Sequence, residues 1–537
     1  MANLIIRTED IKPEHILDMY VESPKDNAII DSIKAINPAI IEGSRGTGKS
    51  FLLRVAEAQL LKSFHTTKIL PVYVAFGKSS LLQTQDPNQF VHWMMARMCS
   101  RIIRALYQMG LLVGPSAALS TLLGGNQTVD IGQTKLETIA KEYEESYKKP
   151  HTEIDFSSIP TVEDFRDSIE DICKEKGIDR ICILFDEAAH IFRPEQQRQF
   201  FTLFRDLRSP YISCNAAVYP GVTFYGTIFQ ANHDGTIITL TRNPLDPDYL
   251  TQMRDIVLKQ ADSVLIENIE RHSINFNALA YSVSGNPRLL LKIIGMAYSM
   301  KANDVKKVLK EFYRTDIWAE HSILADKYIG HRAIIDWGRQ FIETRVIVDT
   351  IEKNSQRLED NKNESTCYFV IHRDSPKVVF EAIRMLSYTG IVTQLDSGVV
   401  ITRGKTGTRY AINLGCIACQ SAEPIVELNR ISKQLSIKRF SEYGENHPIY
   451  QGLVSSVGEF TEGDLAEALN REMTKSISVL DLSSYQERGL FEIGINTIAD
   501  ALHATESDFQ KIKYVGPTRS RQIMNVVFSS ILEYLSG

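Results

Sequence analysis

The chain has no excess of positive charge. Of its 537 residues, 60 are Lys or Arg and 66 are Asp or Glu, which gives a net charge of -6. A surface that binds nucleic acid concentrates basic residues, so any DNA-binding surface of this chain must be local. Repeats and low-complexity tracts are also missing, and the length predicts about three or four globular domains.

Cysteines are few and form no disulfide pattern. The chain has seven, an odd and scattered set, which favours a reducing compartment over a secreted, disulfide-stabilised protein. Cys416 and Cys419 form one CxxC pair. A single pair without a second pair of ligands is a weak zinc motif, and buried thiols are the simpler interpretation.

Long apolar runs are missing as well. The longest weakly polar stretch, residues 110–125, contains Gly, Pro and Ser and is shorter than the roughly 18 residues of a membrane span. It predicts a loop or a short helix. The N-terminal residues, MANLIIRTEDIKPEHILDMY, carry acids where a signal peptide has its apolar core. These features predict a cytoplasmic protein without a membrane segment.

A glycine-rich segment between two apolar runs carries the clearest motif. Residues 43–50, GSRGTGKS, match G-x-x-x-x-G-K-[ST] at every fixed position. A strand-like run precedes the segment and a helical pattern follows it, so backbone N–H groups and a helix that begins near Lys49 can surround phosphate. Lys49 is expected to bind the β- and γ-phosphates of ATP, and Ser50 to ligate Mg²⁺. The predicted cofactor-binding residues are Gly43, Ser44, Arg45, Gly46, Thr47, Gly48, Lys49 and Ser50.

A second motif supports the first. The apolar run Ile181–Phe185 ends in Asp186 and Glu187. A buried parallel strand that ends in two acids suits Mg²⁺ and an attacking water. We expect Asp186 to hold the metal through water and Glu187 to polarise the attacking water. An exposed acidic pair is the alternative, but it leaves the matching P-loop unexplained. Together the motifs predict an ATPase that slowly forms ADP and phosphate.

Further strand-like segments occur at residues 68–76, 212–226 and 235–242, alternating with helical patterns. This alternation predicts an α/β P-loop core, with a parallel sheet and helices on both faces. The extra strand between the P-loop strand and the acidic strand resembles the ATPase class that includes AAA+, STAND and RecA-like proteins.

A more specific resemblance lies downstream, where Gly285-Asn286-Pro287-Arg288 opens an apolar helix. A helix N-terminus explains the Asn-Pro pair but not the arginine. The segment resembles the sensor-2 helix of the lid in AAA+ ATPases of the origin-recognition clade and in STAND ATPases. The resemblance covers roughly residues 19–309. It implies that Arg288 reaches the γ-phosphate and couples the position of the lid to the nucleotide state.

The sequence departs from this clade in two places. No arginine-finger motif follows the fourth strand, and the candidates Arg205, Arg208 and Arg242 are each expected to be surface arginines. The sensor-1 residue is also open, with Tyr219 and Thr223 as the polar residues near the expected strand end.

The pattern changes after the lid. Residues 375–395 predict a helix, capped by Ser375, that leads to a strand, and residues 396–414 predict a hairpin with a basic tip. A helix followed by such a hairpin resembles a winged helix. The resemblance implies DNA contacts, and a domain used for packing or protein contacts is the alternative. The candidate DNA-binding residues of the hairpin are Arg403, Lys405 and Arg409.

The last segment resembles a helix-hairpin-helix unit. Leu502 and Phe509 belong to the leading helices, residues 514–517 (YVGP) to the hairpin, and residues 518–527 to the second helix. Such a hairpin binds a DNA phosphate without reading bases. Tyr514 stands where the hairpin usually has glycine, and docking to a protein is the alternative function. The candidate DNA-binding residues here are Lys511, Lys513, Gly516, Arg519 and Arg521.

These features predict four domains: an ATPase core (1–250), a helical lid (251–312), a winged-helix-like domain (313–425) and a helical region ending in the helix-hairpin-helix (426–537). The predicted function is a nucleotide-controlled DNA-binding switch of the initiator, loader or mobile-element and antiphage-defence type, using ATP and Mg²⁺. The predicted partners are DNA and either further copies of the chain or an effector protein. The alternative is a signalling ATPase whose C-terminal half binds a protein without direct DNA contact.

Overall fold

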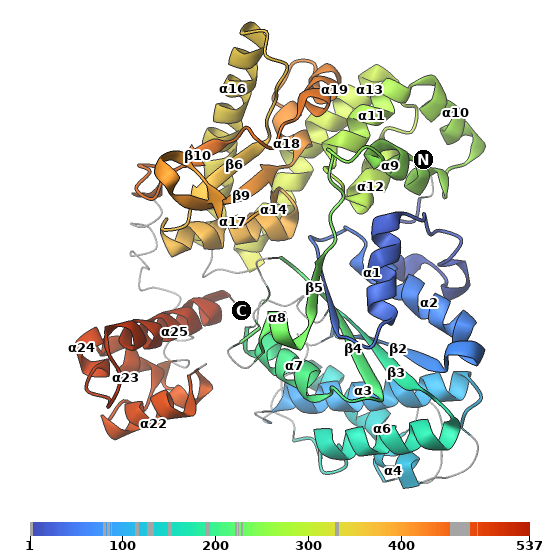
Figure 1. Ribbon diagram of the computed structural model, residues 1–537, viewed down its shortest axis with the longest axis vertical. Coiled ribbons are helices and arrows are strands. Elements are labelled where there is room, and N and C mark those ends of the chain that lie inside the picture. Colours follow the sequence, from blue (N-terminus) through green and yellow to red (C-terminus); the bar gives the residue numbers. More distant parts are fainter. Residues whose placement is uncertain are drawn as a thin grey trace.

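The computed structural model describes residues 4–78, 82, 86, 88–112, 117–125, 134–148, 153–187, 194–220, 223, 225–226, 229–327, 332–451, 473–480 and 482–536. Figure 1 shows a sheet with packed helices in the N-terminal part, a group of helices followed by a second sheet, and a small helical unit near the C-terminus. Within these ranges, no helix has both the length and the apolar character to cross a membrane.

Five parallel strands form the N-terminal sheet, in the order β2-β3-β4-β1-β5, which confirms the predicted α/β core. Only β4 separates β1 from β3, so the carboxyl ends of β1 and β3 lie roughly 10 Å apart. The strand before the glycine-rich segment and the strand before the two acids therefore end at one edge. Their bounds are β1 Ala39–Glu42, β2 Ile69–Ala75, β3 Arg180–Asp186, β4 Ile212–Val218 and β5 Thr236–Thr239.

Two of these strands are shorter than the sequence predicts. β4 ends at Val218, two residues before Pro220, whose missing N–H cannot continue a strand ladder. β5 ends at Thr239, before Leu240 and Arg242 turn toward the P-loop.

Helices cover both faces of this sheet (Figure 1). Successive residues of β3 alternate between two cores, because Ile183 packs into one hydrophobic cluster and Leu184 into the other. One cluster is built on α3, α6 and α7, and the other on α1 and the P-loop helix α2. The bounds are α1 Pro24–Lys34, α2 Lys49–Thr67, α3 Gln89–Gln108, α6 Val162–Lys176 and α7 Pro194–Asp206.

A group of helices follows β5, with the bounds α9 Tyr249–Leu258, α10 Ser263–Arg271, α11 Ser273–Ser282, α12 Pro287–Met296 and α13 Ala302–Glu311. α12 begins where the sequence predicts. Asn286 is its N-cap, and Asn286 Oδ1 accepts a hydrogen bond from the N–H of Leu289 at 3.1 Å. Pro287 fills the first turn, where its missing N–H costs nothing.

The second sheet has the order β10-β6-β9-β7, and β8 pairs with β9. The expected hairpin is present as β8 and β9, but β9 also pairs with β6 and β7, so it is not a free two-stranded wing. The sequence did not identify β6 as a strand. The bounds are β6 Tyr368–His372, β7 Val392–Gln394, β8 Val399–Val400, β9 Thr406–Ile412 and β10 Ser441–Tyr443.

The predicted cap of the helix before this hairpin is wrong. The helix, α17, spans Lys377–Thr389, and its N-cap is Pro376, whose ψ of 135° is extended. No side chain caps this helix. Because Pro376 keeps an extended backbone, the helix starts one residue later than expected, and Ser375 lies outside the cap position.

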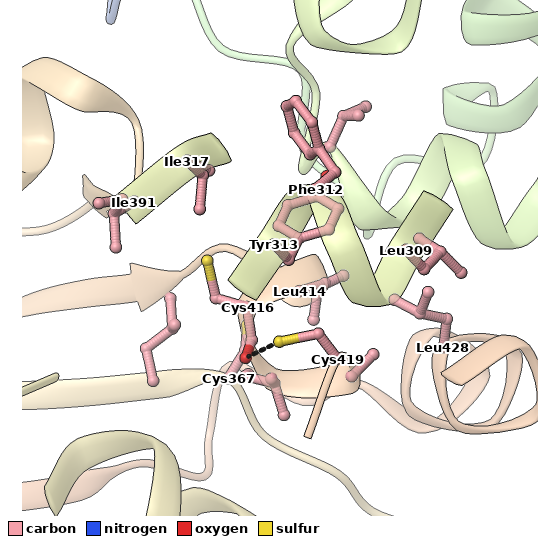
Figure 2. Packing of buried hydrophobic residues seen from close by; sticks show 14 of the residues in the cluster. Leu309, Phe312, Tyr313, Ile317, Cys367, Ile391, Leu414, Cys416, Cys419 and Leu428 are labelled. Atoms are coloured by element: carbon pink, nitrogen blue, oxygen red, sulfur yellow. Dashed lines mark hydrogen bonds between the residues drawn. The ribbon is translucent and has the colours of Figure 1, made fainter. Parts of the chain in front are cut away.

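The core beneath the second sheet contains the CxxC cysteines, as Figure 2 shows. Cys416 lies in the short helix α18 (Leu414–Ala418) and Cys419 is the C-cap of that helix. Both pack in the cluster that contains Tyr313 and Cys367. Cys419 Sγ donates to the Cys416 carbonyl at 3.3 Å, and burial raises the pKa of the Cys419 thiol to about 11. Among the described residues, no cysteine belongs to a group that could hold a metal. The thiols therefore serve as core residues.

A small helical unit ends the described chain, with the bounds α22 Ser484–Glu492, α23 Ile498–His503, α24 Glu506–Phe509 and α25 Pro517–Ser536. Its buried residues, among them Leu490, Phe509 and Ile523, form a hydrophobic cluster of their own. Leu502 and Phe509 lie on the two short helices before the hairpin, as expected.

Candidate nucleotide-binding site

The glycine-rich segment lies between β1 and α2, at the carboxyl edge of the first sheet. Gly46 and Gly48 have φ angles of 88° and 103°, in the left-handed region that favours glycine. Gly48 is the N-cap of α2, so Lys49 and Ser50 stand in the first helical turn. The turn therefore directs backbone N–H groups and the positive end of the α2 dipole toward one point, an arrangement that suits an anion.

Lys49 is buried beside this turn. Its Nζ donates hydrogen bonds to the carbonyl oxygens of Gly43 at 2.6 Å and Ser44 at 3.0 Å. The ring of Tyr219 lies over Nζ, with the centroid 3.9 Å away. Burial lowers the pKa of Lys49 to about 7, and nearby Asp186 only partly offsets this effect. An anion at this position would favour the charged form of Lys49 again.

The two acids at the end of β3 face the same region. The N–H of Glu187 donates to Asp186 Oδ1 at 2.9 Å, and the hydroxyl of Tyr73, on the neighbouring strand β2, donates to Asp186 Oδ2. Burial and the charge of Asp186 hold the pKa of the Tyr73 hydroxyl well above its usual range, so this hydroxyl remains a donor. The guanidinium of Arg54 lies over the Tyr73 ring, with its carbon 3.4 Å from the centroid. Asp186 is thus fixed in orientation by its neighbours.

Glu187 is held in an unusual backbone conformation. Its φ of 57° lies in the left-handed region, which costs free energy in a residue with a side chain. Burial, and next the charge of Asp186, raise the pKa of its carboxyl. A Cβ added to Gly77 would lie 2.1 Å from Glu187 Oε2, so Gly77 leaves the space that this carboxylate occupies. The role of Gly77 was not predicted from the sequence, in which a glycine just after the second strand was the available signal.

The lid helix α12 contacts the P-loop directly. Asn286 Nδ2 donates to the carbonyl oxygen of Arg45 at 2.8 Å, and the N–H of Arg288 donates to that of Gly46 at 3.3 Å. A Cβ on Gly46 would come within 2.6 Å of Asn286 Oδ1 and 2.9 Å of the Arg288 Cβ. The sequence-predicted Arg288 therefore lies against the P-loop, beside Lys49.

A cavity of about 930 Å³ lies beside the P-loop and Arg288, and its described lining residues do not include Asp186 or Glu187. The P-loop residues 46–50, Tyr219 and Arg288 form its polar end. The apolar part of its wall comes from the N-terminal segment, α9 and α12, and includes Ile5, Ile6, Met19, Val21, Ile256 and Leu291. Arg7, Thr8, Asp26, Arg242 and Gln260 also line the cavity. A site with a cationic end and an apolar end suits a nucleotide, whose phosphates and base have these two characters.

Arg242 is buried, so its expected position on the surface is wrong. Its guanidinium donates to both carboxylate oxygens of Asp26, at 3.0 and 3.2 Å, and to the carbonyl oxygen of Thr47 at 2.7 Å. The two side chains are 8% and 5% exposed. Arg242 therefore stabilises the P-loop through its hydrogen bond to the Thr47 carbonyl. Arg208 is exposed, and Arg205 pairs with its neighbour Asp206 at 2.7 Å.

Of the two sensor-1 candidates, Tyr219 lies at the site. Its ring covers Lys49, whereas Thr223 Oγ1 donates to the Tyr219 carbonyl at 2.7 Å and so supports the turn after β4.

A family model matches the N-terminal part of the chain. Residues 5–88 match the family model described as ORC-CDC6-like. Over these residues the chain resembles the ORC-CDC6-like family. This match includes the P-loop and confirms the resemblance to the origin-recognition clade that the sequence motifs indicated. No curated protein matches the chain.

Three solved structures are distantly similar. The ORC1 protein of Aeropyrum pernix in complex with DNA is 14% identical, with 78% of this chain and 94% of that chain covered and a TM-score of 0.34. A Walker-type ATPase of Pyrococcus abyssi is 14% identical, with 79% and 97% covered and a TM-score of 0.38. The ORC2 protein of Aeropyrum pernix, in ADPNP–ADP complexes, is 10% identical, with 78% and 97% covered and a TM-score of 0.34.

The residues expected at the basic hairpin tip do not gather on one surface. Arg409 lies within β9, is only 13% exposed and pairs with Asp396 at 3.0 Å. Lys405 pairs with Glu445 at 3.0 Å. Arg403 lies in the tip itself, and its side chain falls outside the described parts of the chain.

Glu445, the partner of Lys405, also belongs to a group of residues that could bind a cation. His372, Asp374 and Glu445 bring their ligand atoms within 4.8 Å of one another. However, His372 Nδ1 already accepts a hydrogen bond from the N–H of Asp374 at 3.0 Å, and the Lys405 ammonium forms an ion pair with the Glu445 carboxylate. His372 Nδ1 and Glu445 therefore already have partners, whereas His372 Nε2 is buried and has none among the described residues.

The C-terminal hairpin does gather the predicted basic residues. Tyr514 adopts a φ of 62°, the conformation that glycine usually supplies at this position, and its side chain is 72% exposed. Arg519 donates to the Tyr514 carbonyl at 2.9 Å. Acids from α24 approach the basic residues: Lys511 pairs with Asp508 at 2.7 Å and Arg521 with Glu506 at 3.4 Å. A Cβ on Gly516 would meet nothing within 4 Å, so the hairpin backbone is open there.

The lowered pKa of Lys49 predicts that nucleotide binding takes up a proton at pH 8. With a pKa of about 7 the side chain is mostly neutral at pH 8, and a phosphate anion beside Nζ raises this pKa, so the complex binds more protons than the free protein. Calorimetric titration at pH 8, in two buffers of different ionisation enthalpy, should report an uptake approaching about one proton per nucleotide. At pH 6, where Lys49 is already charged, its contribution should nearly vanish. Identical binding enthalpies in both buffers at pH 8 would contradict the assignment.

Proposed function

We propose that this chain binds ATP with Mg²⁺ at the P-loop, hydrolyses it slowly, and uses the nucleotide state to set the position of its lid and C-terminal units on DNA. The observation that carries the proposal is the contact of Asn286 and Arg288 with the carbonyl oxygens of Arg45 and Gly46. Gly46 and Arg288 also line the cavity that contains Lys49. A lid bonded to the phosphate-binding turn responds to what that turn binds.

The side chains around the cavity suit the separate steps of ATP hydrolysis. Lys49 neutralises phosphate charge, and Ser50 and Asp186 offer the oxygen ligands that Mg²⁺ prefers. When bound, Mg²⁺ would neutralise charge that develops on the phosphates. Glu187 is the general base, because burial moves its pKa toward neutrality. Arg288 reads the γ-phosphate from the lid.

The C-terminal half is close enough to the site to respond to it. The N–H of Leu414, at the second sheet, donates to Ser284 Oγ at 2.9 Å, two residues before the Asn286 contact. Tyr388 of α17 packs edge-on against Tyr219, with centroids 5.4 Å apart, and Tyr219 covers Lys49. These contacts support a switch in which movement at the P-loop shifts the first three proposed domains (1–250, 251–312 and 313–425) relative to one another.

Two variants test whether the carboxylate of Glu187 takes part in ATP hydrolysis. Glu187→Gln should lower turnover by on the order of 10²-fold or more, because it removes the base. Gly77→Ala should also lower turnover, because its Cβ would lie 2.1 Å from Glu187 Oε2 and must displace that flexible side chain. ATP affinity should stay within about threefold of wild type in both. Phosphate release and calorimetry supply the measurements.

The matched control for Gly77→Ala is Gly444→Ala, because a Cβ at position 444 meets nothing within 4 Å. It should turn over ATP normally. Normal turnover in Glu187→Gln would show that another group acts as the base.

We propose that the C-terminal hairpin supplies the DNA contact. Two features support this: the four basic residues lie around an open turn, and α25 begins there with the free N–H groups of a helix N-terminus. Such a surface holds phosphates of any sequence. Arg409 and Lys405 are weaker candidates, because their side chains are only 13% and 46% exposed, against 68% for Lys511 and 70% for Arg521. The second candidate function is docking of an effector protein, which the acids Glu506 and Asp508 beside the hairpin favour.

Replacing the four basic residues of the hairpin by Ala separates these functions. DNA affinity should fall about equally for all sequences, and each lost contact should remove about 0.9 from the slope of log K against log[salt] on duplex DNA. Nucleotide affinity should not change. Fluorescence anisotropy at several salt concentrations measures both quantities. The variant combines Lys511→Ala, Lys513→Ala, Arg519→Ala and Arg521→Ala.

The control removes the same charge elsewhere, from exposed lysines of α2 and the lid: Lys62, Lys259, Lys301 and Lys307. It should bind DNA like wild type. If the hairpin variant keeps both its affinity and its salt slope, the hairpin docks a protein instead.

A further inference from the structure

A second cavity, of about 1210 Å³, lies beside the P-loop helix α2. Its walls come from α2, the edge strand β2, α3, and the N-terminal turns Thr8–Asp10 and Pro13–His15. It is separate from the nucleotide cavity, with which it shares only Thr8 and Ile11 as lining residues. Neither the sequence motifs nor the proposed ATPase function assigns it a role.

Three arginines line this cavity. Arg101 and Arg104 lie three residues apart on α3, which puts them on one face of that helix, and Arg54 comes from α2. Arg54 pairs with Glu57 at 2.7 Å, and Arg104 pairs with Glu137 at 3.1 Å.

Arg101 differs from the other two. Within the described part of the chain it takes part in no hydrogen bond or ion pair, and its Nε is buried without a partner. Burial, and then the charges of Arg97, Arg104 and Arg54, lower the pKa of Arg101. Among the described residues that line the cavity, Glu9 is the one acid besides Glu57, and it is exposed and makes no ion pair with Arg101.

Without a bound ligand, this arrangement of three arginines raises the free energy of the folded protein. A buried N–H group without an acceptor costs free energy, and cations that face one another repel. An oxyanion between the arginines removes both costs, because the planar guanidinium matches two oxygens of a phosphate. The remaining walls include Ile11, Leu61 and Met109, which offer an apolar surface to the rest of a ligand.

We propose that this cavity binds a small phosphate-bearing molecule, with its phosphate held by Arg101 and flanked by Arg54 and Arg104. Phosphate is preferred to a single carboxylate, because a dianion balances more of the converging positive charge. The site goes beyond the proposed ATPase function and does not depend on it.

Pyrophosphate is a suitable probe, provided that it cannot use the P-loop. Lys49→Ala removes the main phosphate charge of the P-loop, so calorimetric titration of pyrophosphate without Mg²⁺ into that full-length variant reports on the second cavity. We expect binding at one site. Adding Arg101→Gln should weaken it by about tenfold or more, the loss expected for a charged hydrogen bond. Adding Arg166→Gln, at an exposed arginine of α6, should change nothing.

A thermal measurement separates binding from a structural role. Without pyrophosphate, Arg101→Gln in the otherwise unchanged chain should melt at the same temperature as wild type or higher, because it removes an unpaired, repelled charge. A clearly lower melting temperature would make Arg101 a structural residue and overturn the proposal. No pyrophosphate binding to Lys49→Ala, or equal binding after Arg101→Gln, would also overturn it. Citrate binding as tightly as pyrophosphate would refute the phosphate assignment.

Discussion

The contact between the P-loop and the lid helix α12 is the constraint on which the rest of the site depends. Gly46 has no room for a side chain, because Asn286 and Arg288 occupy the space beside it. The same two residues donate hydrogen bonds to the successive carbonyl oxygens of Arg45 and Gly46. Close-packed contacts of this kind do not deform gradually, so the turn and the lid move together or separate. The P-loop beside Lys49 is thereby tied to the helices that contain α12, which is the basis of the proposed coupling.

The support for this contact comes from distant parts of the chain. A Cβ on Gly285 would lie 2.0 Å from the carbonyl oxygen of Arg242, so the turn before α12 packs onto that backbone. Arg242 in turn pairs with Asp26 and holds the Thr47 carbonyl. Breaking such a buried pair typically costs about 3–5 kcal/mol, since it leaves an unpaired buried charge. The first helix, the P-loop and the lid are therefore one connected structure.

The sequence predicted those elements whose conformation is determined by residues close together in the chain. The P-loop turn, the strand before Asp186 and the start of α12 each follow from neighbouring residues. The Asp26–Arg242 pair, the hydroxyl of Tyr73 on Asp186 and the space beside Gly77 join segments that are far apart in sequence, and no spacing rule reveals them. Likewise, no pattern in the sequence distinguishes Arg101 from the other polar residues of its helix. β6 was missed because its residues are buried on both faces and carry no alternation.

The nucleotide affinities of Arg288→Ala test the central claim, that the lid reads the nucleotide through α12. Because only ATP carries a γ-phosphate, ATP affinity should fall by about tenfold or more, the cost of one charged hydrogen bond, while ADP affinity stays nearly unchanged. Lys292→Ala, one turn further along α12 and 46% exposed, is the matched control and should bind both nucleotides like wild type. Calorimetry that finds equal losses for ATP and ADP would contradict the account, because Arg288 would then only support the fold.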